Sequence, residues 1–224
     1  MPSYEAICFD LDRTLCQPTR DPDDVLAAVF EHANIEPFCS AADIRETVHE
    51  VSAPVTDRTF FESLFSTIAD RKGVEPSCAP TLAESFLQVR DPTAVRLCQG
   101  AERALDRARE IGPVGLVTNG SKPAQRQKLE ALGLHDAFDV TVFTDPTSGM
   151  DPKPAPGPFE HVLSSVGVSP QRSLHIGDSL ESDVAGASAA GMDSAWLAES
   201  PPTPSRDLEP TYRLSSLEDI HGIV

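Results

Sequence analysis

Residues 6–15 read AICFDLDRTL, and the fold prediction starts from this stretch. Four apolar residues, Ala6-Ile7-Cys8-Phe9, end abruptly at Asp10, and a second carboxylate follows at Asp12. A short apolar run that enters a polar turn is typical of a strand buried on both faces of a sheet. The stretch therefore predicts a buried strand whose carboxyl end carries two acidic side chains.

Further apolar runs of the same kind follow along the chain. They cover residues 114–117, 138–143, 173–176 and 194–197, and residues 212–215 are a candidate for a last edge strand. Helix-like patterns lie between several of the runs, at 102–110, 123–132, 158–166 and 182–190. Strands that alternate with helices predict an α/β fold, in which helices cover both faces of a mostly parallel sheet.

The segment from about Pro22 to about Val95 breaks this alternation. It contains helical patterns at 25–32, 41–51, 58–71 and 80–89, broken by prolines, and no clear strand. We interpret it as a helical insert between the first and second strands of the sheet. The predicted organisation is a core of residues 1–17 and 96–224, with a helical domain at residues 18–95.

The charge balance narrows the possible partners. The net charge of -17 over 224 residues argues against nucleic acid and against anionic membrane surfaces, because both require basic patches. The lysines are few: Lys72, Lys122, Lys128 and Lys153. An acidic, lysine-poor surface suits a cytoplasm of high ionic strength, where salt screens self-repulsion, so salt adaptation is a hypothesis.

Other features indicate a cytoplasmic protein. No signal-peptide pattern occurs at the N-terminus, and no apolar stretch is long enough to span a membrane. The five cysteines are scattered and form no CxxC pair or Cys/His cluster, so they predict reduced thiols rather than a disulfide framework or a zinc site.

Polar side chains follow the predicted strands, and the carboxyl ends of parallel strands meet at one edge of a sheet. We therefore expect a cluster made up of Asp10, Asp12, Thr118, Asn119, Asp178 and, after a loop, Lys153. Its carboxylates repel one another, which a divalent cation would relieve, and oxygen ligands without His or Cys favour Mg²⁺. The remaining groups are donors that suit a phosphoryl group.

These residues also carry a family resemblance. Asp10-Leu-Asp12-Arg-Thr14-Leu15 resembles the DxDxT motif of the haloacid dehalogenase-like (HAD) hydrolases. Thr118-Asn119-Gly120, Lys153-Pro154 and Gly177-Asp178-Ser-Leu-Glu-Ser-Asp183 resemble the second, third and fourth motifs, in the family's order. The resemblance implies a Rossmann-like core with an inserted helical cap, like that of the phosphoglycolate phosphatases. The activity it implies is a Mg²⁺-dependent phosphatase acting on a small phosphorylated metabolite.

The resemblance also implies roles. Asp10 would attack phosphorus and form an aspartyl-phosphate, and Asp12 would protonate the leaving oxygen and then deprotonate the attacking water. Mg²⁺ would be held by Asp10, the backbone carbonyl of Asp12, and Asp178.

The other motif residues would support this chemistry. Thr118, Lys153 and the backbone N–H of Asn119 would hold the phosphoryl oxygens. Asp183 would orient Lys153 or bind a metal-bound water, and Thr14 completes the first motif as a supporting residue.

Alternative functions stay open at this point. The haloacid dehalogenases lack the second aspartate, so Asp12 argues against dehalogenation. Lys72 is the only lysine in the insert, which gives little support to a phosphonate hydrolase. A phosphosugar mutase would keep the same core. A non-catalytic phosphate-binding regulatory module is the alternative from another class, although the nucleophile, the acid/base and the metal ligands are all present.

Two nearby residues have plainer interpretations. Arg13 stands where the family usually has Gly or Asp, and it either meets an anionic substrate or is exposed without a role. His175 lies inside the fourth predicted strand, which favours a packed core histidine over a catalytic base.

Overall fold

The computed structural model describes residues 4–48, 50–51, 56–144, 149–198 and 208–224. The chain divides into two compact units, one made of Met1–Gln17 with Val95–Val224 and the other of Pro18–Ala94. Within the described residues, no helix combines the length and the apolar character that crossing a membrane requires.

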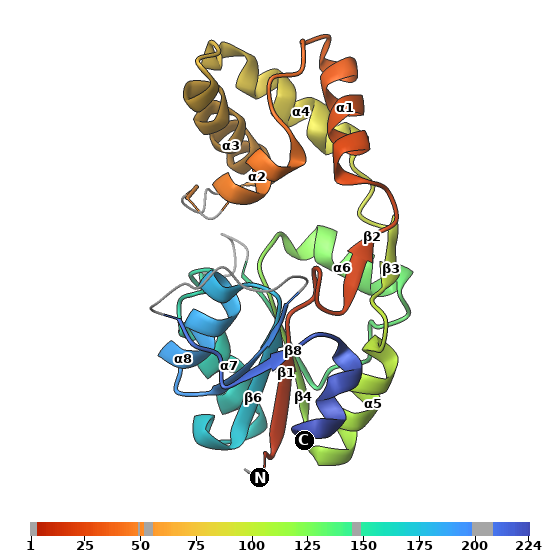
Figure 1. Ribbon diagram of the computed structural model, residues 1–224, viewed down its shortest axis with the longest axis vertical. Coiled ribbons are helices and arrows are strands. Elements are labelled where there is room, and N and C mark those ends of the chain that lie inside the picture. The colour runs from red at the N-terminus through yellow and green to blue at the C-terminus, as the bar shows by residue number, and fades with distance from the viewer. Residues whose placement is uncertain (1–3, 49, 52–55, 145–148, 199–207) are drawn as a thin grey trace. The chain divides into compact units, whose positions relative to one another are not determined.

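A six-stranded parallel sheet forms the centre of the first unit (Figure 1). Its strands stand in the order β5-β4-β1-β6-β7-β8. Their bounds are β1 (Ala6–Phe9), β4 (Val114–Thr118), β5 (Val140–Phe143), β6 (Ser173–Gly177), β7 (Asp193–Leu197) and β8 (Tyr212–Leu214). This arrangement confirms the predicted α/β class with its parallel, Rossmann-like core.

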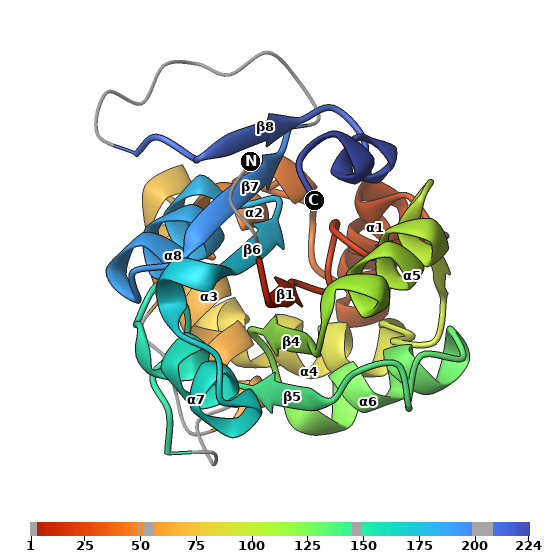
Figure 2. The same cartoon turned by 90° about the horizontal axis from the view of Figure 1, so that it is seen from below.

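Helices cover both faces of this sheet, as Figure 2 shows in a view roughly along the strand direction. One face carries α5 (Ala101–Ile111), α6 (Lys122–Ala131) and the 3-10 turns of η4 (Leu217–Gly222). The other carries α7 (Gly157–Val166) and α8 (Ala185–Ala189), and the short turns η2 (Pro170–Arg172) and η3 (Leu180–Val184) flank β6.

Strand β1 shows why the first apolar run has no polar face. Its side chains alternate between two separate cores. Ile7 and Phe9 pack with Leu105 of α5, whereas Cys8 packs with Phe159 of α7. A strand in the middle of a two-sided sheet needs apolar residues at every position, which is the pattern in the sequence.

Most boundaries in this unit lie within one residue of the predicted ones, but two differ by two residues. Strand β5 begins at Val140 rather than 138, because the side chain and backbone of Asp139 are both hydrogen-bonded to Val114. The predicted helix 182–190 begins earlier, as the π-helical turn η3, because Ser179 accepts hydrogen bonds from the first N–H groups.

The second unit is helical. It contains α1 (Pro22–Ala33), α2 (Ala41–Thr47), α3 (Asp57–Lys72), the 3-10 turn η1 (Pro76–Cys78) and α4 (Ala79–Val89). Fully buried Phe30, Phe65 and Leu82 form its core. Helix α2 ends at Thr47, before the predicted 51, where the N–H of Glu50 bonds to the carbonyl of Thr47 in a turn, and residue 49 lies outside the described residues.

Two short strands that the sequence did not reveal lie where the chain passes from one unit to the other. β2 (Cys16–Pro18) and β3 (Val95–Leu97) form a two-stranded sheet. Each has three residues, which is too few for a periodic pattern to show.

Candidate active site

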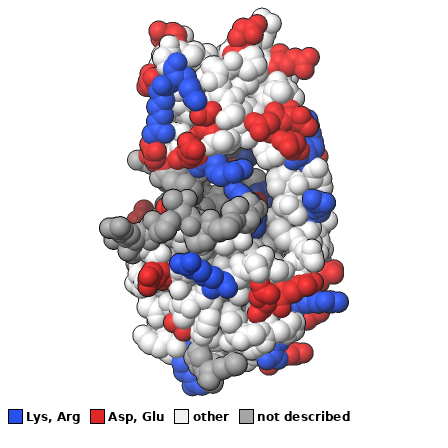
Figure 3. Space-filling model, in the orientation of Figure 1, with Lys and Arg blue, Asp and Glu red and all other residues white. Residues whose placement is uncertain are grey.

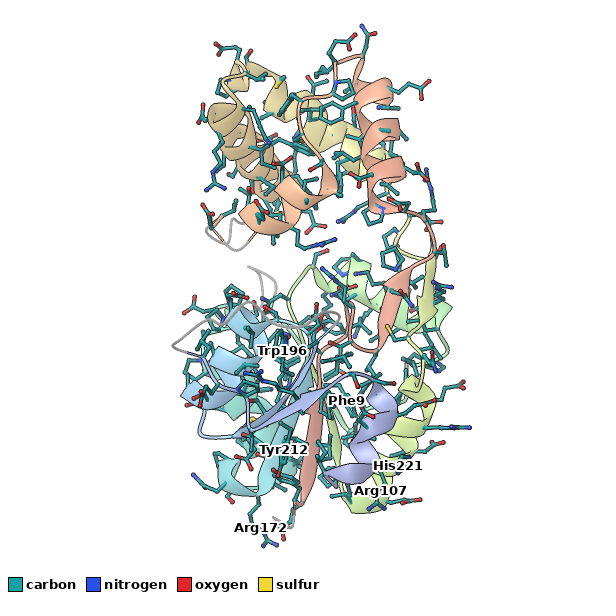
Figure 4. All side chains as sticks on the ribbon, in the orientation of Figure 1. Phe9, Arg107, Arg172, Trp196, Tyr212 and His221 are labelled. Atoms are coloured by element: carbon teal, nitrogen blue, oxygen red, sulfur yellow. The ribbon has the colours of Figure 1, made fainter. Side chains whose placement is uncertain are left out.

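The site lies at the carboxyl ends of the central strands. The backbone N–H of Asp10, directly after β1, bonds to the carbonyl of Ile176 at 2.9 Å and continues the pairing with β6. Thr118 is the last residue of β4, and Asp178 follows β6. Figure 4 labels Trp196 of β7, whose indole N–H donates to the backbone carbonyl of Asp178 at 2.8 Å. Ligands of open α/β sheets bind at this edge.

Lys153 is the buried cation of the site. Its Nζ donates to Asp10 Oδ1 at 2.6 Å, to Asp183 Oδ1 at 2.7 Å and to the carbonyl of Val117 at 2.9 Å. These three acceptors match the three hydrogens of an ammonium group. Burial would lower the pKa of Lys153, but Asp10 and Asp183 outweigh it and raise this pKa, so the side chain stays charged.

Asp183 anchors this lysine. Its Oδ1 also lies 3.0 Å from Nε2 of His175, and its Oδ2 accepts the backbone N–H of Ser179 at 3.1 Å. Although burial opposes ionisation, Lys153 and His175 hold the pKa of Asp183 well below its usual range. His175 is a core residue that packs edge-on against Phe159, and it also fixes this carboxylate, which sequence reasoning did not foresee.

Three carboxylates gather where a cation could bind. Oxygen atoms of Asp10, Asp178 and Asp183 all lie within 4.8 Å of one another. Burial raises the pKa of Asp10 to about 8, against the opposing effect of Lys153, and burial raises the pKa of Asp178 to about 7. Both oxygens of Asp183 already accept hydrogen bonds, so Asp10 and Asp178 are the better ligand candidates. An all-oxygen donor set of this kind fits Mg²⁺.

Asn119 ties the loop of Lys153 to the sheet. Its Oδ1 accepts the backbone N–H of Lys153 at 2.9 Å and the hydroxyl of Thr144 at 2.7 Å, and its Nδ2 donates to the carbonyl of Lys153 at 3.1 Å. The side chain expected among the phosphate donors is therefore engaged in fixing the loop. Its backbone N–H is the group that stays a candidate for the phosphoryl oxygens.

Asp12 has two partners that the sequence did not single out. Lys128 Nζ lies 2.6 and 2.7 Å from its two carboxylate oxygens, and Gln125 Nε2 lies 2.8 Å from Oδ2. Both partners belong to α6, the helix that begins soon after Thr118. In the sequence, two features hint at this contact: the scarcity of lysine, and the three-residue spacing of Gln125 and Lys128 on a predicted helix.

The remaining first-motif residues shape the turn after β1. Arg13 adopts a left-handed backbone (φ 64°), its N–H bonds to the carbonyl of Cys16 at 2.6 Å, and its Nε lies 3.6 Å from Asp178 Oδ2. The hydroxyl of Thr14 is buried, and no hydrogen-bond partner for it occurs among the described residues. Thr14 therefore packs within the turn, and Arg13 borders the acidic cluster.

The parallel sheet and the acidic, lysine-bearing cluster at its strand ends define an α/β enzyme site. A model of the haloacid dehalogenase-like hydrolase family matches residues 4–191. The chain belongs to this family, which confirms the resemblance of its motifs, and it is an enzyme of the hydrolase class.

Relatives and solved structures agree with this assignment. The chain is 32% identical to pyrimidine 5'-nucleotidase YjjG of Escherichia coli, over 71% of this chain and 69% of that protein. It is 27% identical to N-acylneuraminate-9-phosphatase of Rattus norvegicus, over 98% and 93% of the two chains. The crystal structure of the HAD-hydrolase YfnB from Bacillus subtilis shares the fold, with a TM-score of 0.73, 23% identity and 98% of both chains covered.

Proposed function

We propose that this protein is a Mg²⁺-dependent phosphatase that hydrolyses a small phosphomonoester through an aspartyl-phosphate on Asp10. The observation that carries the proposal is the arrangement around Asp10. This carboxylate lies at a strand end, 2.6 Å from a buried ammonium group and next to a second carboxylate, Asp178. A nucleophile, a compensating cation and a candidate metal ligand are thus together.

The relatives of this chain support the general statement that it is a phosphatase of the HAD family. Relatives that cover most of the chain are named as phosphatases or nucleotidases, and a phosphoserine phosphatase of Thermus thermophilus is 31% identical over 75% of this chain. The YfnB structure is described as bound to magnesium, which supports the choice of metal.

The chain's own residues account for the first half of the reaction. A carboxylate oxygen of Asp10 attacks phosphorus while the bond to the leaving oxygen breaks, and Asp12 gives that oxygen a proton. The charge of Lys153, and the donors at Thr118 and the Asn119 backbone, stabilise the transferring phosphoryl group.

The second half restores the enzyme. Asp12 takes a proton from water, the water oxygen attacks phosphorus, and the bond between phosphorus and Asp10 breaks to release phosphate. Mg²⁺, held by Asp10, Asp178 and the backbone carbonyl of Asp12, would neutralise charge on the phosphoryl oxygens when bound.

We propose that the helical unit, Pro18–Ala94, acts as the cap that excludes water and selects the leaving group. The support is its position in the chain, between β1 and β4, where the resemblance of the sequence motifs implies an inserted helical cap. The relatives named above act on different phosphorylated metabolites. The substrate class is accordingly a small phosphomonoester, and a panel of phosphorylated metabolites is the screen that identifies it.

The test of the proposal compares wild type with Asp10→Asn. We expect wild type to release phosphate from 4-nitrophenyl phosphate with Mg²⁺ and to lose this activity with EDTA. Asp10→Asn keeps the shape of the site but lacks the nucleophile, so its activity should fall by about 10³-fold or more. Equal, metal-independent rates for both proteins would support the non-catalytic module and overturn the proposal. Phosphate transfer between two positions of a phosphosugar, without net release, would support the mutase.

A further inference from the structure

Two side chains of α6 contact the catalytic motifs without belonging to any of them. Gln125 and Lys128 stand one helical turn apart on the same face of the helix, and both reach Asp12. We propose that they are positioning residues that aim the Asp12 carboxyl group for proton transfer, and that Gln125 also orients Thr118. This inference rests on the proposed function, because it assigns the residues a part in that same reaction.

Lys128 fixes the rotation of the Asp12 carboxyl group. Its Nζ lies 2.6 Å from Oδ1 and 2.7 Å from Oδ2, so it holds both oxygens rather than one. Only 19% of the Lys128 side chain is exposed, whereas 41% of the Asp12 side chain is. The lysine is thus the sheltered partner, and it holds in one orientation an aspartate that would otherwise rotate in solvent.

Gln125 joins the first two motifs through one buried atom. Its Nε2 lies 2.7 Å from the Thr118 hydroxyl, 2.8 Å from Asp12 Oδ2 and 3.0 Å from the Asn119 carbonyl. Because Thr118 accepts a hydrogen bond from this amide, its own hydroxyl hydrogen can point to a phosphoryl oxygen. A side chain at Gly120 would approach this nitrogen to 3.3 Å, so glycine there keeps room for the contact.

The positioning role makes a specific kinetic prediction. A correctly aimed Asp12 matters when the leaving oxygen needs a proton, as an alkoxide does. It matters little when the leaving group is a stable anion, such as 2,4-dinitrophenolate. Loss of Lys128 should therefore slow the cleavage of alkyl phosphates selectively. General damage to the fold would slow both kinds of substrate equally.

The experiment measures kcat/KM, which reports formation of the aspartyl-phosphate, for glycerol phosphate and 2,4-dinitrophenyl phosphate. With Lys128→Met, the value for glycerol phosphate should fall by at least about 10-fold more than the value for 2,4-dinitrophenyl phosphate. Lys128→Arg, which keeps a cation, should recover part of the loss. The matched control is Arg126→Met, which removes an exposed cation from the same helix and should change neither value.

A double-mutant cycle keeps the inference falsifiable. If Lys128 acts through Asp12, then Lys128→Met should cause no further loss in an Asp12→Asn background. Should Lys128→Met fail to fold, Gln125→Leu tests the same geometry. It should slow both substrates through Thr118, and slow glycerol phosphate further through Asp12. An equal loss on both substrates, or additive losses in the cycle, would overturn the inference. Activity that survives Asp10→Asn would instead overturn the proposed function, so the two failures are distinct.

Discussion

At the scale of single residues, Lys153 is the side chain on which the acidic cluster depends. We expect Lys153→Met to destabilise the protein by about 3–5 kcal/mol, because it leaves the buried carboxylates of Asp10 and Asp183 without their cation. Phosphatase activity should be lost as well. Urea unfolding followed by circular dichroism measures the change in stability.

The matched control is a surface pair in the same unit. Arg103 lies 3.7 Å from Glu218, with 76% and 45% of the two side chains exposed. Arg103→Met should cost no more than about 1 kcal/mol, as exposed ion pairs do. If the two variants unfold at the same urea concentration, the cluster does not depend on Lys153.

Much of the site could be predicted from single residues, and the reason is topological. Asp10, Thr118 and Asp178 each follow a recognisable apolar run, and parallel strands bring their ends together. Lys128 and Gln125 lie more than a hundred positions from Asp12 and on a helix, so no strand-end rule brings them to it. The role of the Asn119 side chain was likewise hidden, because it depends on where the distant Lys153 loop packs.

At the scale of elements, the last residue of β6, Gly177, has no room for a side chain. A Cβ atom on Gly177 would overlap the carboxyl group of Asp183. We expect Gly177→Ala to push Asp183 away from Lys153, to destabilise the protein by about 1–3 kcal/mol and to reduce kcat, because overpacking forces its neighbours to move. Thermal unfolding and phosphate release measure the two effects.

Gly157 provides the comparison for this variant. It begins α7, and a Cβ atom there meets no other atom within 4 Å. Gly157→Ala should keep its activity and change stability by no more than about 1 kcal/mol, in the stabilising direction that alanine favours in helices. Similar losses for both variants would show that glycine at 177 has no special part in positioning Asp183.

Element types were easier to predict than element ends. Continuous apolar runs identified the central strands, because burial on both faces of the sheet requires apolar residues at every position. The start of η3 was missed, since it depends on the bonds that Ser179 makes with the backbone of the next turn. The β2–β3 pair was missed because it depends on contacts between residues far apart in sequence.

At the scale of the whole molecule, negative charge dominates, with 35 acidic against 18 basic residues. On the face shown in Figure 3, acidic and basic side chains are interspersed rather than gathered into one basic patch. The buried carboxylates of the site are part of this excess of negative charge. Folding therefore forces together groups that would be separated and hydrated in the unfolded chain, which links stability to protons and to metal.

This linkage gives a test of the metal site. Burial raises the pKa of Asp10 to about 8 and that of Asp178 to about 7, whereas an aspartate in an unfolded chain titrates near 4. Between these values the folded, metal-free protein keeps protons that the unfolded chain has released, so its stability should fall as pH rises from about 4 to about 8. A bound cation replaces those protons.

Mg²⁺ should therefore raise the Tm more at about pH 8 than at about pH 6, where protons compete with it for the same carboxylates. Differential scanning fluorimetry with Mg²⁺ or EDTA, at constant ionic strength, measures both shifts. Asp178→Asn removes one candidate ligand and should abolish most of the Mg²⁺-dependent gain at the higher pH. A gain that is equal at both pH values, or unchanged in Asp178→Asn, would mean that Mg²⁺ stabilises the protein elsewhere than at these carboxylates.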